Sequence, residues 1–117
     1  MDVDGLWLVA FKTEAGWKSG GVLALVGDRM VGGDSSFYYV GDSKRSRDAD
    51  GWLLDGTLKV RHYDGSDLTS YGVHTRGFDA RFHAKIPDPG GKGVGNISAP
   101  PPGPGTVAFH LTRQHNV

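Results

Sequence analysis

The chain has 117 residues, enough for one domain with its own hydrophobic core. It contains no cysteine, which excludes disulfides, thiolate zinc sites and a cysteine nucleophile. Its 13 basic and 13 acidic residues balance, which argues against direct nucleic-acid binding. No apolar stretch has the length of a membrane span, and the acidic start of the chain lacks the positive region of a signal peptide. We therefore expect a single cytoplasmic domain over residues 1–117.

Glycine and proline divide the chain into short segments, since there are 19 glycines and 6 prolines. Helical periodicity is absent, whereas alternation of apolar and polar residues recurs along the chain. This alternation predicts strands over residues 5–12, 17–26, 30–31, 36–40, 52–63, 73–86, 93–98 and 106–113. Because so many short strands leave edges to protect, the pattern favours an all-β, eight-stranded antiparallel barrel that is closed on itself. A two-sheet sandwich is the alternative.

The first two predicted strands are apolar on both faces. Over residues 5–12, Trp7 and Val9 share one face while Leu6 and Leu8 share the other. A monomeric barrel buries only one face of each strand, so the second face is available for another subunit. We therefore predict a homodimer, with an interface that includes Leu6, Leu8, Ala10, Leu23 and Leu25.

The segment from Gly41 to Gly51 is polar and rich in charge, so we predict a loop. Basic side chains near its middle are available to contact an acidic partner protein. A solvated surface loop without a partner is the equally simple interpretation. The predicted protein-binding loop consists of Lys44, Arg45, Arg47, Asp48 and Asp50.

The later strands alternate more cleanly, with one apolar and one polar face. The interior of an eight-stranded barrel is either filled by side chains or just wide enough for one small ligand. If a cavity is present, the side chains that line it are predicted to be Leu58, Val60, His62, Phe78, Phe82 and Phe109. Such a cavity would hold a small apolar molecule.

No catalytic or metal site is predicted. The alternation points His62 inward and His83 outward, so the five histidines do not converge on one spot. The Gly32-Gly33-Asp34 segment lacks the following helix that a phosphate loop requires, and a bend or bulge accounts for it. We accordingly expect a protein that is not an enzyme and has no cofactor. An enzyme that uses His62 with a nearby carboxylate ranks last.

Several segments of the first half resemble the GrlR-like family, whose named member is a negative regulator of type III secretion in attaching-and-effacing enteric bacteria. The resemblance extends over about residues 5–63, and the glycine-glycine-aspartate run followed by aromatics is its most specific part. The matching segments are Gly5-Leu6-Trp7, Gly20-Gly21-Val22-Leu23, residues 32–41 and Val60-Arg61-His62-Tyr63.

The resemblance implies a compact, dimeric, lipocalin-like barrel that regulates by binding protein. The family's named member sequesters a helix-turn-helix transcriptional activator through an acidic run in an exposed loop. In the corresponding loop here only Asp48 and Asp50 are acidic, and three basic residues precede them. The resemblance thus predicts a regulator of virulence gene expression that binds a transcription factor, while the loop differs in charge. Fold alone does not determine function, so a small apolar ligand in the barrel is the alternative.

Overall fold

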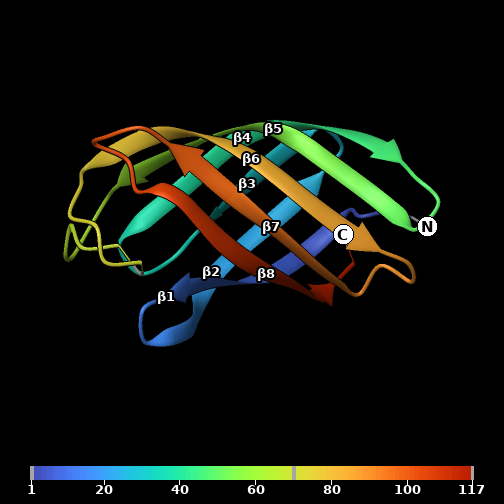
Figure 1. The fold of residues 1–117 in the computed structure, drawn as a ribbon, viewed down its shortest axis with the longest axis horizontal. Coiled ribbons are helices and arrows are strands. Elements are labelled where there is room, and N and C mark those ends of the chain that lie inside the picture. The colour runs from blue at the N-terminus through green and yellow to red at the C-terminus, as the bar shows by residue number, and fades with distance from the viewer. Residues whose placement is uncertain (1, 70, 117) are drawn as a thin grey trace.

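The computed structural model describes residues 2–69 and 71–116. Eight strands follow one another in space in chain order and close into one antiparallel barrel, so the predicted closed, lipocalin-like barrel is confirmed (Figure 1). A two-sheet sandwich is excluded, because the first strand pairs with both the second and the last. The strands are β1 (Gly5–Thr13), β2 (Gly16–Val26), β3 (Arg29–Gly33), β4 (Phe37–Arg47), β5 (Gly51–His62), β6 (Gly77–Pro87), β7 (Lys92–Ala99) and β8 (Gly105–His115).

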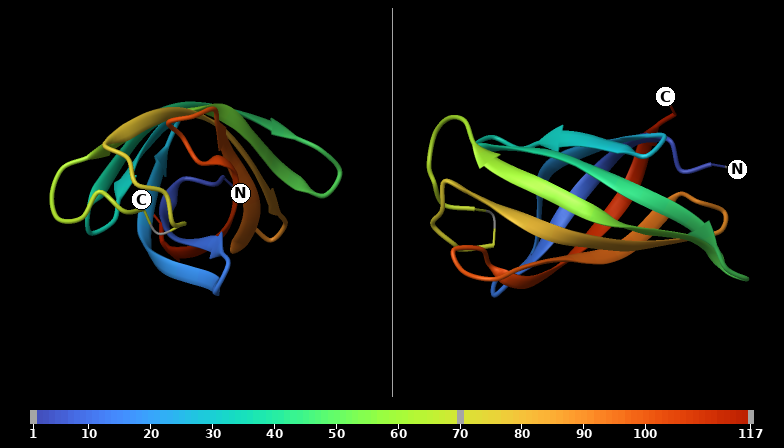
Figure 2. Two further views of the ribbon diagram at one scale, coloured as in Figure 1. Left: turned by 60° about the vertical axis from the view of Figure 1, so that its left-hand side comes forward. Right: turned by 90° about the horizontal axis from the view of Figure 1, so that it is seen from above.

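The two ends of the barrel differ. The start of β1 pairs with the end of β8, and both chain ends therefore lie at the same end of the barrel (Figure 2). The long β5–β6 loop over 63–76 and the proline-rich β7–β8 loop lie at the other end (Figures 1 and 2). Within the described ranges no helix has the length and apolarity needed to cross a membrane.

The interior is filled by the apolar face of every strand. In β6 the alternation is regular: Phe78, Ala80 and Phe82 are buried, whereas Asp79 and Arg81 are exposed. A closed sheet has no edge to cover, so its inner face alone forms the hydrophobic core. The largest completely buried side chains are Trp7, Phe37, Phe109, Leu25, Met30, Leu54, Ile86, Leu111, Val3 and Val60.

Side chains also close both ends of the barrel. At the loop end, Tyr71 lies edge-on against Phe11, with 5.2 Å between ring centroids, and against Phe78 at 6.4 Å. At the terminal end, the Trp7 indole donates a 3.0 Å hydrogen bond to the Val3 carbonyl. The Arg113 guanidinium lies 4.7 Å above the Trp7 ring and donates to the Asp4 carbonyl at 2.7 Å. Water is thereby kept from the core at both ends.

Two sequence-based predictions are wrong. The polar run after Gly41 is not a loop, because β4 continues to Arg47 and pairs with β5 along its whole length. Leu23 and Leu25 belong to the core, at 2% and 0% exposure, and cannot form part of an outer interface. Both errors arise because neighbouring strands decide what a local pattern leaves open. A polar run can be a strand when a second strand pairs with it, and a strand that is apolar on both faces can turn either face inward.

Close approach of β4 to β5 depends on Gly56, which pairs with Ser43 of β4 and Phe82 of β6. A Cβ atom added there would collide with the backbone carbonyl of Asp42. Glycine is the residue that permits such close approach of two strands in a tightly coiled barrel.

We predict that Gly56→Ala lowers the free energy of unfolding by about 1–3 kcal/mol, because a backbone strand must shift to admit the methyl group. Gly91→Ala is the matched control, since nothing lies within 4 Å of an added Cβ atom at that position. Urea unfolding of the two variants measures the difference. Equal stability of both would contradict the account of β5.

Candidate functional site

Two basic side chains of the β4–β5 hairpin, Arg45 and Arg47, form ion pairs within the molecule. The Arg45 side chain is only 13% exposed and donates hydrogen bonds to the carboxylates of Asp2 and, at 2.6 Å, of Asp4. Arg47 donates two hydrogen bonds to Asp88, at 3.0 and 2.9 Å, and lies 5.1 Å above the Trp52 ring. These two predicted contact residues therefore tie the hairpin to the chain terminus and to the β6–β7 turn.

Asp48 organises the tip of the same hairpin. Its carboxylate accepts hydrogen bonds from the Asp50 and Gly51 amides, at 2.8 and 3.0 Å, and these contacts lower the pKa of Asp48. Lys85 lies within 3.8 Å of Asp48 and 3.7 Å of Asp50. Of the five predicted contact residues, only Lys44 forms no ion pair with a described residue. The hairpin is thus better explained as an internally braced element than as a free binding loop.

We predict that Asp4→Asn lowers stability at pH 7 by about 1 kcal/mol, because it removes a charge-assisted hydrogen bond from a largely buried arginine. Hydrogen bonds from Arg45 and the Gly27 amide hold the pKa of Asp4 below its ordinary value of 3.8. The carboxylate therefore stabilises the fold above about pH 3.8, and this contribution disappears as the pH falls through the lowered pKa.

Thermal unfolding between pH 2 and pH 7 measures the effect, and the difference from the unaltered protein is expected to shrink at the acid end. Asp28→Asn is the control. Asp28 lies in the turn between β2 and β3, and its backbone carbonyl, which the substitution leaves in place, accepts a hydrogen bond from the Ser43 amide. A pH-independent difference for Asp4→Asn would contradict the assignment.

The barrel interior leaves almost no space. Five of the six predicted cavity residues are buried apolar side chains of the core, as their alternation predicts: Leu58, Val60, Phe78, Phe82 and Phe109. Three of them, Leu58, Phe82 and Phe109, line a void that measures only about 20 Å³. Phe82 and Phe109 stack at 5.2 Å across this region. A drug-sized or lipid-like ligand occupies a pocket of roughly 300–1,000 Å³, so the filled interior does not fit the ligand-carrier hypothesis.

His62 lies at the loop end of the barrel, where it packs edge-on against Phe37 at 5.4 Å. Its Nε2 atom lies 3.1 Å from the Gly65 carbonyl, so its observed partner is a backbone group. The enzyme hypothesis paired His62 with a nearby carboxylate, and among the described residues the hydrogen-bond partner of its ring is the Gly65 carbonyl.

Two histidine–carboxylate pairs were missed by sequence reasoning. His83 Nδ1 lies 2.7 Å from Asp55, and His74 Nδ1 lies 2.9 Å from Asp67. The first pair joins β5 to β6 and could be found only from their register, which places Asp55 opposite His83. Both pairs are exposed. Within the described part of the chain, no three such side chains come close enough to hold a metal ion.

A buried tyrosine–aspartate contact braces the start of β4. The Asp34 carboxylate accepts a short hydrogen bond from Tyr39 and further bonds, each of 2.9 Å, from the Ser36 and Phe37 amides. Burial, followed by the bond to Asp34, raises the pKa of Tyr39. Gly32 and Gly33 therefore belong to the end of β3, and Asp34 forms the structural turn that follows.

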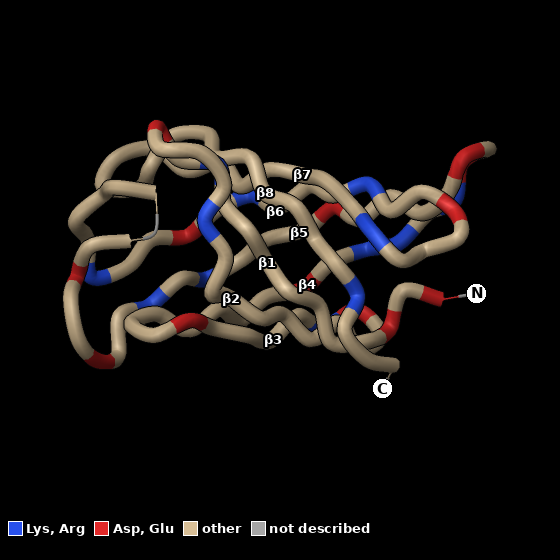
Figure 3. The backbone as a smooth tube through the Cα atoms, turned by 90° about the horizontal axis from the view of Figure 1, so that it is seen from below, with Lys and Arg blue, Asp and Glu red and all other residues tan. Residues whose placement is uncertain are grey.

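The outer face of the barrel is apolar and carries no charge over the first part of β1, the second part of β2, the middle of β3 and the start of β4. Strand register places Leu8 and Val22 in one row with Tyr38, and Leu6, Ala24 and Val31 in the next row with Val40. Figure 3 shows the central parts of β1, β2 and β3 without acidic or basic residues. We call this surface the uncharged face; it consists of Leu6, Leu8, Ala10, Val22, Ala24, Val26, Val31, Tyr38 and Val40.

Exposure of the uncharged face is substantial. Val22 is 41% exposed, Val31 50% and Val26 53%. Polar residues border it: Arg61 of β5 lies opposite Tyr38, and His115 of β8 lies opposite Leu6. An apolar centre with a polar rim is the usual anatomy of a protein–protein interface. Leu6, Leu8 and Ala10 thus lie on the face where they were predicted.

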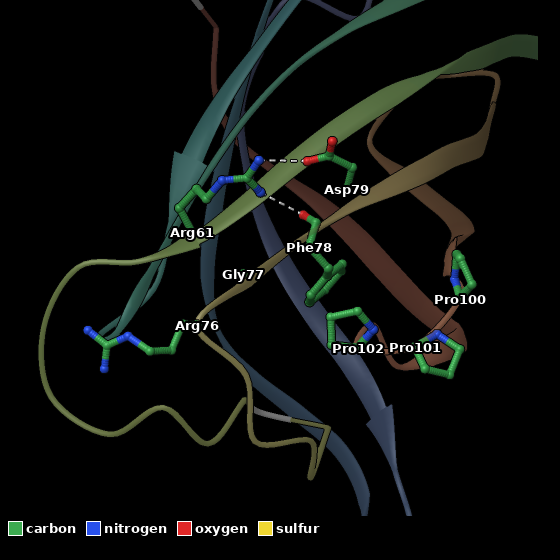
Figure 4. A pocket seen from close by; sticks show the side chains of 8 residues that line it. All are labelled: Arg61, Arg76, Gly77, Phe78, Asp79, Pro100, Pro101 and Pro102. Carbon is green, nitrogen blue, oxygen red and sulfur yellow. Dashed lines mark hydrogen bonds and ion pairs between the residues drawn. The ribbon is translucent and has the colours of Figure 1, made fainter.

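Surface hollows occur on the other side of the barrel. The one in Figure 4, of about 500 Å³, lies between the start of β6 and Pro100–Pro102 of the β7–β8 loop. Arg61 bonds Asp79 at 2.8 Å and the Phe78 carbonyl at 3.0 Å along one wall, while Arg76 points away from the prolines (Figure 4). The hollow is shallow and open rather than a formed active site.

No protein-family model matches this chain, and no curated protein sequence matches it.

Proposed function

We propose that the protein is a non-enzymatic binding protein that forms a homodimer through the uncharged face. Its role is regulatory: the dimer binds a transcriptional activator protein, as the resemblance to the GrlR-like family implies. The observation that carries the proposal is the uncharged face, with its exposed Val22, Val26 and Val31. Large exposed apolar patches on small proteins mark sites of association.

The size of the uncharged face suits a dimer. Four adjacent strands about 4.8 Å apart and about six residues along each give a patch of roughly 15 by 20 Å. This patch of about 300 Å² would form the apolar centre of the interface, and the polar rim would supply the rest of the roughly 800 Å² per partner of a standard complex.

The chemistry of the face favours a second copy of the chain as its occupant. Its side chains hold no charge, and Tyr38 carries their one polar group, a phenolic hydroxyl. Two such faces related by a two-fold axis bury each other without desolvating an ion. A strongly charged partner would find no complementary group there.

The filled interior supports a function on the outer surface of the barrel. A void of about 20 Å³ leaves the carrier alternative without a site of adequate size. We therefore place regulation by protein binding before ligand transport.

We predict that Val31→Glu yields a monomer at micromolar concentration, because it places a charge at the centre of the interface. Val94→Glu is the matched control, since Val94 on β7 is 51% exposed, against 50% for Val31, but lies outside the uncharged face. Native mass spectrometry and sedimentation distinguish the two. A monomeric unaltered protein, or dimers of both variants, would overturn the dimer assignment.

A further inference from the structure

The end of β4 and the outer faces of β5 and β6 carry charged residues, in contrast to the uncharged face. A series of hollows crosses them, with volumes of about 520, 250, 400 and 500 Å³. Neighbouring hollows share lining residues: Asp55 joins the first two, Arg81 the next two, and Asp79 the last two. We call these adjacent hollows together the depression.

Three of the four carboxylates that line these hollows have a side-chain partner. Asp42 lies 3.4 Å from Arg29, Asp55 lies 2.7 Å from His83, and Asp79 lies 2.8 Å from Arg61. Figure 4 shows the last of these pairs at the β6 end of the depression. Two of the carboxylates, Asp42 and Asp79, are therefore paired with arginines within the fold.

Four exposed cations that line the hollows form no ion pair with a residue in the described part of the chain: Lys44, Lys59, Arg76 and Arg81. Three of them lie together on adjacent strands, namely Lys44 on β4, Lys59 on β5 and Arg81 on β6, whereas Arg76 precedes β6. Arg81 lies opposite Thr57 in the β5–β6 ladder, while Lys59 lies opposite Asp79. We call Lys44, Lys59 and Arg81 the cationic track.

The spacing of the track suits an extended chain. Lys44 pairs with Asp55, and Lys59 follows Asp55 by four residues on β5, which separates the two lysines by about 13 Å along the strand. Lys59 and Arg81 are diagonal neighbours on adjacent strands, roughly 7–8 Å apart. An extended peptide advances about 3.3 Å per residue, so acidic side chains at every second position match this spacing.

We propose that the cationic track binds an acidic, extended segment of a partner protein. This inference rests on the proposed function, because it assigns the surface by which the dimer holds its partner. Strand order separates the two surfaces: with eight strands around the barrel, direction changes by about 45° per strand, so β5 and β6 face away from β2 and β3. Dimer formation therefore centres on β1–β3 and partner binding on β5 and β6, while β4 contributes Tyr38 and Val40 to the first surface and Lys44 to the second.

Nucleic acid fits the track less well than an acidic peptide. Asp42, Asp55 and Asp79 lie among the cations and would repel a continuous row of phosphates. A peptide places its carboxylates only where cations lie. The balanced charge of the whole chain, 13 basic against 13 acidic residues, adds no long-range attraction for a polyanion.

Fluorescence anisotropy of a labelled ten-residue peptide of alternating glutamate and serine tests the proposal at low and physiological salt. The unaltered protein is expected to bind the peptide, more weakly as salt increases. The triple variant Lys44→Glu, Lys59→Glu, Arg81→Glu is expected to bind the peptide more weakly, by a factor of about 10 or more. The control is the triple variant Lys12→Glu, Lys18→Glu, Lys92→Glu, which changes the net charge equally at exposed lysines outside the track.

Retention of binding by the control triple variant supports the track. Absence of binding by the unaltered protein at low salt overturns it, as does equal loss in both triple variants. Tighter track-dependent binding of a labelled single-stranded oligonucleotide would also overturn it, in favour of nucleic acid. Native masses of the same samples test the dimer separately: a monomer that binds the peptide contradicts the dimer alone, and a dimer that does not bind contradicts the track alone.

Discussion

Closure of the sheet by the pairing of β1 with β8 is the constraint on which the rest of the structure depends. This ladder joins residues near the two ends of the chain, from Leu6 opposite His115 to Phe11 opposite Phe109. Once it forms, every strand has two neighbours and every inner face is enclosed. Arg113, at the end of β8, then closes the terminal end by lying over Trp7 and bonding the Asp4 carbonyl. The core, the sealed ends and the absence of an internal cavity all follow from this closure.

A filled barrel leaves the outer surface to interact with other molecules, and that surface is divided by charge. The middle of β1–β3 and the start of β4 present valine, leucine, alanine and tyrosine, whereas the end of β4 and the outer faces of β5 and β6 carry acids and bases. Because the chain as a whole is neutral, this division is invisible in its composition. This division allows the uncharged face to associate with the same face of a second copy, and allows the opposite side of the barrel to attract a partner of opposite charge. The family and curated-sequence comparisons, which found no match, leave this division of the surface as the main guide to function.

The β4–β5 hairpin illustrates how pairing changes the meaning of a charged segment. In the sequence, Lys44, Arg45 and Arg47 look like one basic cluster offered to a partner. In the fold, alternation along β4 turns Arg45 toward Asp2 and Asp4 and leaves Lys44 outside. Arg47 reaches Asp88, which is 41 residues away in the chain. Free positive charge therefore lies on neighbouring strands rather than in one loop.

Much of the fold could be predicted from the sequence, because a strand with one polar and one apolar face shows by this alternation which of its residues point into the core. Phe78 and Phe82 were predicted to face the interior from alternation, and both are buried. A strand that is apolar on both faces carries no such signal. For β2 the prediction placed Leu23 in an outer interface, whereas the structure buries Leu23 and exposes Val22.

The sequence by itself therefore determined the class of fold, the number of strands and the orientation of the strands with one polar face, because these depend on local alternation and on the turns that glycine and proline impose. Only the tertiary structure decided the length of β4, the inner face of β2, the absence of an internal cavity and the pairing of each charge. Those properties depend on contacts between residues that are distant in the chain, such as Asp55 with His83 and Arg45 with Asp4. No local pattern encodes such contacts, since the register between strands and the closure of the barrel bring them about.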